Sequence, residues 1–166
     1  MPTEKETREA IAALIRLVAP DAVVIPRDQL GLLAEGDFVP LISSSTGKIR
    51  GWIVTQTGAE LVTQGDSWAD YRFTWRIVQI HEYKTGDDNT NSEDGFGSER
   101  GDVMLAFLDP SAVSGIDATT LTNLGNIDAP TFSGNAIRVA PGREGGKRVH
   151  IADGSISAVI KVGVCA

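Results

Sequence analysis

The sequence has little of what stabilises secreted or membrane-embedded proteins. Cys165 is the only cysteine among 166 residues, so an internal disulfide cannot form. No run of apolar residues approaches the length that crosses a membrane, and the N-terminal stretch MPTEKETREA is polar rather than signal-like. We therefore expect a protein that folds in the cytoplasm, with no disulfide framework and no membrane partner.

Positive charge is also scarce, which bears on nucleic-acid binding. The chain has 15 Lys and Arg against 22 Asp and Glu, a net charge of −7. Residues 71–84, YRFTWRIVQIHEYK, place an aromatic row beside arginines, a pattern that can stack nucleic-acid bases. Affinity for nucleic acid comes mainly from Lys and Arg side chains that contact phosphates, however. Two arginines on one strand of an acidic protein therefore do not favour a nucleic-acid-binding face.

Catalytic motifs are missing as well. The stretch GREGGKR, residues 142–148, lacks the P-loop pattern, because Pro141 stands where a glycine is needed and Arg148 where a Ser or Thr is needed. His81 and His150 belong to no HExxH spacing, and no GxSxG occurs. We predict no enzyme activity, no catalytic residues and no cofactor.

An acidic segment raises the possibility of a metal site. Oxygen-bearing side chains alternate, as in the first half of an EF-hand loop, at Asp87, Asn89, Asn91 and Glu93. The glycine and the glutamate needed at the sixth and twelfth positions are Ser92 and Ser98. We therefore predict no metal ligands and a solvated acidic loop with carboxylates at Asp87, Asp88, Glu93 and Asp94. A small ligand- or calcium-binding module stays open as an alternative function.

The chain order of the elements predicts the fold class. Thr3 and Glu6 have the spacing of a capping box at the start of a helix that Pro20 ends, and a short strand, AVVIP, follows. Strands IRGWIVTQ and YRFTWRIVQIHEYK come next and should pair antiparallel, before a second helix closed by Pro110. Three β-like pieces complete the chain, AIRVA, KRVHIAD and SISAVIKVG, with a hairpin expected at Asp153-Gly154.

Runs of strands and of helices, rather than strict alternation, indicate an α+β fold. We predict a mainly antiparallel β-sheet with two helices packed on one face, in a single domain over residues 1–166. Long loops are expected at about 57–70, 86–98 and 111–147.

The strand at residues 71–84 has two different sides. Tyr71, Phe73, Trp75 and Ile77 should lie under the helices, whereas the other side carries Arg72, Arg76, Val78 and Ile80. We expect this second side to be open in the monomer and to contact another subunit. Together with two of the tryptophans, which are costly to expose, the predicted interface residues are Trp52, Trp68, Arg72, Arg76 and Ile80.

The layout resembles a known family. An opening helix TREAIAALIRLV leads into AVVIP, then into the strands GWIVTQ and YRFTWRIVQIHEYKTG. The acidic turn DNTNSED precedes a helix ending in VMLAFLD, and the chain finishes in SISAVIKVGV. This order resembles the tail terminator, or tail-completion, proteins of long-tailed bacteriophages, which join the head to the tail.

The resemblance implies a virion structural protein rather than an enzyme. It implies a homo-oligomeric ring, commonly a hexamer, on the head-proximal end of the tail tube, with the tail tube protein and a neck or connector protein as partners. The resemblance also implies that the protein is located in the tail or neck of the virion after assembly in the host cytoplasm. DNA would pass through without specific binding if the acidic loop faces the channel. Another neck or tail-tube ring subunit is the alternative within this class.

Overall fold

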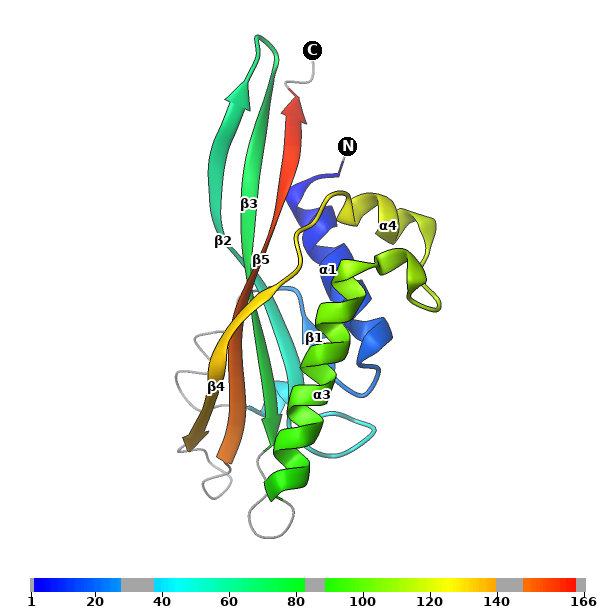
Figure 1. Ribbon diagram of the computed structural model, residues 1–166, viewed down its shortest axis with the longest axis vertical. Coiled ribbons are helices and arrows are strands. Elements are labelled where there is room, and N and C mark those ends of the chain that lie inside the picture. Colours follow the sequence, from blue (N-terminus) through cyan, green and yellow to red (C-terminus); the bar gives the residue numbers. More distant parts are fainter. Residues whose placement is uncertain (1, 28–37, 83–88, 140–147, 164–166) are drawn as a thin grey trace.

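The chain folds into one sheet with its helices on one face (Figure 1). The structure, a computed structural model, describes residues 2–27, 38–82, 89–139 and 148–163. The helices and helical turns are α1 (Glu4–Val18), η1 (Val39–Leu41), α3 (Asn89–Leu108), η3 (Pro110–Ala112) and α4 (Ala118–Leu124). The strands are β1 (Val23–Ile25), β2 (Arg50–Gln64), β3 (Trp68–Glu82), β4 (Thr131–Val139) and β5 (Arg148–Gly163).

The five strands lie in the order β1-β2-β3-β5-β4. Only β1 pairs in parallel, at one edge, and every other pair is antiparallel. The predicted α+β class and mainly antiparallel sheet are therefore confirmed, and so is the pairing of the strands carrying Trp52 and Trp75. Within the described residues, the helical layer also contains the short α4, which was not predicted.

Helix α1 begins and ends where its sequence indicates. The Thr3 side chain accepts a hydrogen bond from the Glu6 backbone N–H, and the Glu6 carboxylate accepts one from the Thr3 N–H, which completes the predicted capping box. Its apolar stripe packs with α3 against the sheet, around Trp75 and Ile77, which are fully buried. The prediction that the aromatic side of this strand lies under the helices is confirmed for these two residues.

The opposite side of the sheet is not open along its whole length, which corrects the prediction for Val78 and Ile80. Both are buried in a second apolar cluster, beneath Phe38 and Leu41. The segment around η1, which sequence patterns left irregular, folds across this part of the sheet. An added Cβ at Gly51 would lie 2.6 Å from a methyl group of Leu41, so this strand position allows the close contact only as glycine.

Two predicted connections are strands instead. Residues 57–64 continue β2, and only Gly65, Asp66 and Ser67 separate β2 from β3, so the long loop predicted at 57–70 was wrong. Pairing with β3 overrides the weak strand propensity of this stretch, and register shifts near Thr57 and Val62 accommodate it.

The predicted hairpin at Asp153-Gly154 was also wrong, because β5 runs straight through both residues. Asp153 forms an ion pair with Arg76 on the adjacent strand, and the Phe132 ring occupies the space beside Gly154. Gly154 is therefore a position of close packing within a continuous strand and not part of a turn.

Two further loop predictions require correction. Helix α3 begins at Asn89, so most of the predicted acidic loop at 86–98 is helical. The predicted loop at 111–147 contains η3, α4 and β4 within its described part. Asp117 caps α4 by accepting a hydrogen bond from the Thr120 backbone N–H, a signal that the sequence carried.

Candidate assembly surface

The most exposed part of the sheet is a projecting three-stranded segment, which we call the arm. It consists of Gly58–Gln64 of β2, Trp68–Thr74 of β3 and Ser157–Gly163 of β5, paired antiparallel with one register shift in β2 between Leu61 and Thr63. Figure 1 shows that the end of the β2–β3 hairpin extends past the helices. The helical cover reaches the sheet just below the arm, where the Trp75 indole N–H donates to Glu4 of α1 over 2.8 Å.

The arm carries apolar side chains on both faces. On the face toward the helices, Leu61 is 48% exposed and Val162 is 45% exposed. On the other face, which we call the open face, Val159 is 44% exposed and Trp68 is 36% exposed. Because isolated monomers rarely leave apolar groups clustered in this way, the arm has the composition of a protein contact.

The β2 edge of the arm has no strand beside it among the described residues. Strand β1 pairs only with Gly51–Ile53, near the opposite end of β2. Residues 55–64 extend beyond this pairing for about 33 Å at the usual rise of a strand. They include no proline and no lysine, the residues that commonly protect a sheet edge from pairing with another chain.

The β5 edge of the arm is open at the same level. Strand β4 pairs with β5 only as far as Ser155. The last contacts on this edge are a bridge between Ile127 and Ala158 and a hydrogen bond from the Asp128 N–H to the Ser157 carbonyl. Beyond them, Val159–Gly163 has no described partner on its outer side. The arm therefore has one open edge on each side.

The two open edges carry opposite charges. Glu60 is the only charged residue in the β2 segment 55–64, and Lys161 is the only one in the β5 segment 156–163. Glu60 pairs with Arg72 of β3, and Lys161 pairs with Asp70 of β3. Paired residues point to the same face of a sheet, and Arg72 and Asp70 point to the open face, so Glu60 and Lys161 lie there too. The Lys161 ammonium lies 4.3 Å from the centroid of the Trp68 ring, which orients it near the end of the arm.

The structure separates the predicted interface residues into two groups. Trp68 and Arg72 lie on the exposed arm. Trp52 and Ile80 are completely buried, so their predicted role as contact residues was wrong. Trp52 faces α3 and Ile80 lies beneath the η1 segment, and each contributes to a core cluster of this chain.

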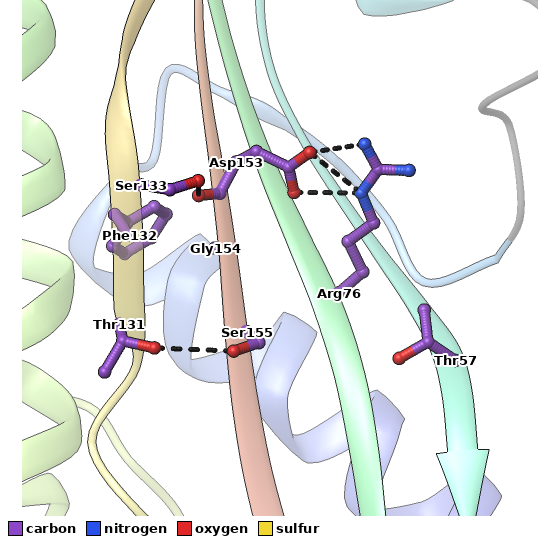
Figure 2. Close-up of a pocket in the computed structure, with 8 residues that line it drawn as sticks. All are labelled: Thr57, Arg76, Thr131, Phe132, Ser133, Asp153, Gly154 and Ser155. Carbon is purple, nitrogen blue, oxygen red and sulfur yellow. Dashed lines mark hydrogen bonds and ion pairs between the residues drawn. The ribbon is translucent and has the colours of Figure 1, made fainter.

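Arg76 lies just below the arm, beside a shallow hollow on the open face (Figure 2). Its guanidinium forms a bidentate ion pair with Asp153, with 2.8 Å between Nε and Oδ1. The hollow, of about 460 Å³, is lined further by hydroxyl groups and by Phe132; the hydroxyl residues are Thr57, Thr131, Ser133 and Ser155. Arg76 is thus held by its own chain, with its side chain about 41% exposed.

The most perturbed carboxylate lies in the core and not on a surface. Glu99 of α3 is almost fully buried and accepts hydrogen bonds from Arg50 and from the Trp52 indole, 2.8 Å away. Burial raises the pKa of Glu99, but His81 at 3.4 Å, Arg50 and Trp52 outweigh it and bring the pKa to about 2. The group is an ionised anchor between α3 and the sheet.

Only part of the predicted acidic loop lies within the described residues. Asp87 and Asp88 lie outside the described residues, whereas Glu93 and Asp94 belong to the first turns of α3, with Asp94 exposed. The backbone is helical from Asn89 onward, so this part of the chain does not form the loop of an EF-hand site. In the described part of the chain, no three His, Cys, Asp or Glu side chains gather as a metal site would require.

Sequence reasoning missed most of the arm. Leu61 and Val62 were assigned to a connection, and the open-face position of Val159 and Lys161 depends on where β4 ends. The available signal is the alternation of apolar residues in the last strand, where Ile156, Ala158, Ile160 and Val162 share one face.

No family model matches the sequence, and no curated protein shows significant similarity to it. None of the described helices is long and apolar enough to cross a membrane.

Proposed function

We propose that this chain is a ring-forming structural subunit of a phage tail, and specifically the tail terminator. The observation that carries this proposal is the arm, which combines two open sheet edges with exposed apolar side chains on both faces. Such a segment is costly for an isolated monomer and suits a subunit that contacts neighbours on both sides. The order of elements that resembles tail terminators supports the same function.

The protein would act by the shape of its ring surfaces and not by catalysis. One end of the ring would match the last ring of the tail tube, and the other would present a surface to the neck or connector protein. Binding would complete a stacking surface that otherwise continues to grow, without a catalytic step or a cofactor. The net charge of −7 would disfavour adhesion of DNA phosphates as the genome passes through the ring.

Electron microscopy of the purified protein, alone and mixed with purified tail tubes, tests the function. We expect closed rings, or density capping the head-proximal end of the tubes. Density distributed along the tube would instead identify a tube subunit, and density on an isolated connector would identify a neck subunit. Particles that stay monomeric and never bind a tube or a connector would refute the proposed class.

A matched pair of variants connects the function to the arm. Leu61→Asp places a charge on an exposed apolar position of the arm, and Leu17→Asp does the same on α1, where Leu17 is about as exposed. Both variants should remain folded by circular dichroism. We expect only Leu61→Asp to prevent ring formation and tube capping, and equal activity of the two variants would exclude the arm.

A further inference from the structure

The two open edges of the arm run in the same direction, which restricts how copies of this chain can combine. Strands β2 and β5 are each antiparallel to β3, so they are parallel to one another. When one copy is rotated about an axis along the arm, its β5 edge comes beside the β2 edge of the next copy with parallel polarity. Repeating the same step joins every arm into one continuous sheet and leaves no open edge in a closed ring.

The backbone groups needed for this pairing face outward on β5. The Ser157 carbonyl points away from β3, because it accepts the hydrogen bond from Asp128 over 2.9 Å. Backbone groups alternate in direction along a strand, so Val159, Lys161 and Gly163 also direct their N–H and C=O groups to the open edge. On β2, the register shifts near Thr57 and Val62 bracket a regular stretch, Gly58–Leu61, of similar length.

The charges favour this combination over a two-fold pairing of identical edges. Glu60 and Val159 both lie opposite Arg72, so they are at the same height on the arm. Strands that close into a barrel are tilted and staggered in register, so Glu60 of one copy comes near Val159 and Lys161 of the next, which lie two residues apart on the same face. Pairing of two β2 edges would bring Glu60 toward Glu60, and pairing of two β5 edges would bring Lys161 toward Lys161.

We propose that the β2 edge of the arm pairs in parallel with the β5 edge of a second copy of this chain, with Glu60 beside Val159 and within reach of Lys161 across the junction. The ring neighbour of the proposed function is that second copy, and in this respect the inference rests on the proposed function. The apolar residues at the edges of the arm, Val159 among them, then contact side chains of the neighbouring copy across the junction.

Cysteine cross-linking tests the polarity of the pairing. In a Cys165→Ser background, Glu60→Cys and Val159→Cys are made as separate proteins and treated with a short bis-maleimide, alone and mixed, with and without tail tubes. We expect covalent dimers only in the mixture, and a ladder of oligomers from the double variant. A Glu9→Cys variant on α1, mixed with Val159→Cys, is the control and should not cross-link.

Charge reversal tests the contact between Glu60 and Lys161. We expect Glu60→Lys and Lys161→Glu each to raise the concentration needed for ring formation about five-fold, measured by mass photometry, and the double variant to restore it. Glu9→Lys, an equal charge change away from the arm, should have no effect. Restoration by the double variant is the result that general surface electrostatics would not produce.

The outcomes separate this inference from the proposed function. Rings seen by microscopy without the mixed cross-link would overturn the edge pairing and leave the terminator function intact. The mixed cross-link in a protein that never binds tubes would support the pairing and refute the function. Cross-linking of Glu60→Cys alone would show a two-fold β2 pairing and overturn the inference, and absence of both cross-links and rings would overturn both proposals.

Discussion

Glu99 on α3 accepts hydrogen bonds from both Arg50 and Trp52 of β2, so one buried carboxylate joins the longest helix to the sheet. Helix α3 contains Gly95, Gly97 and Gly101, each of which lowers helix propensity by roughly 1 kcal/mol. Its position therefore depends on tertiary contacts such as this carboxylate and the packing of Phe96 against His150, whose rings are 5.2 Å apart. These contacts hold the helical layer against the sheet whose strands continue into the arm.

Replacing Glu99 by Gln should destabilise the fold while keeping its shape. The amide retains one acceptor for the Trp52 indole but removes the negative charge that balances Arg50. We expect the free energy of unfolding, measured by urea denaturation at pH 7, to fall by about 1–3 kcal/mol. Glu60→Gln, the same change on the exposed arm, is the control and should leave it nearly unchanged. Equal stabilities of the two variants would show that Glu99 is not an anchor.

The contribution of Glu99 should depend on pH in a defined direction. Its pKa in the folded chain is about 2, below the ordinary value of 4.5, so the folded state favours the ionised form. The stabilisation is fully present above the ordinary pKa and is lost as the pH falls from about 4.5 toward 2. Over this range, wild type should lose about 3 kcal/mol more than Glu99→Gln. Parallel pH profiles for the two proteins would contradict the assignment.

Gly154 should tolerate no side chain without loss of stability. An added Cβ would lie 2.6 Å from Cδ1 of Phe132 and 2.8 Å from the Thr131 carbonyl oxygen, and the carbonyl cannot move independently of β4. We expect Gly154→Ala to lower the free energy of unfolding by about 1–3 kcal/mol in thermal or urea denaturation. Gly58→Ala is the matched control, because an added Cβ there meets nothing within 4 Å. If both variants have wild-type stability, β4 and β5 do not pack as described.

The sequence predicted those parts of the fold that local chemistry determines. The capping box at Thr3 and Glu6, the end of α1 before Pro20 and the alternation around Trp75 each indicated the correct element. Predictions failed where a distant partner decides the outcome. Asp153-Gly154 has the residues of a tight turn, but pairing of Asp153 with Arg76, which is far away in sequence, keeps the strand continuous.

The residues of the candidate assembly surface were also predicted only where local sequence patterns determine their position. Strand alternation correctly placed Arg72 on an accessible side, whereas Trp68 was assigned to a loop and chosen as a contact for its side-chain type alone. The burial of Ile80 could not be predicted, since the cover comes from the segment around Leu41, whose sequence has no regular pattern. The open edges of the arm could not be predicted from local sequence patterns, because an edge depends on where the neighbouring strands β1 and β4 end.

Trp68 should report directly on the arm by fluorescence. Trp52 and Trp75 are fully buried, whereas Trp68 is 36% exposed near the end of the hairpin, so acrylamide should quench one component of the emission readily. Trp68→Phe should remove this component, and Trp52→Phe should retain it. The neighbouring copy would lie beside β5, where Gly163 opposite Trp68 has no side chain to screen it, so quenching should decrease as the protein concentration rises into the range where rings form. An unchanged quenching constant across ring formation would place the contact between subunits elsewhere on the molecule.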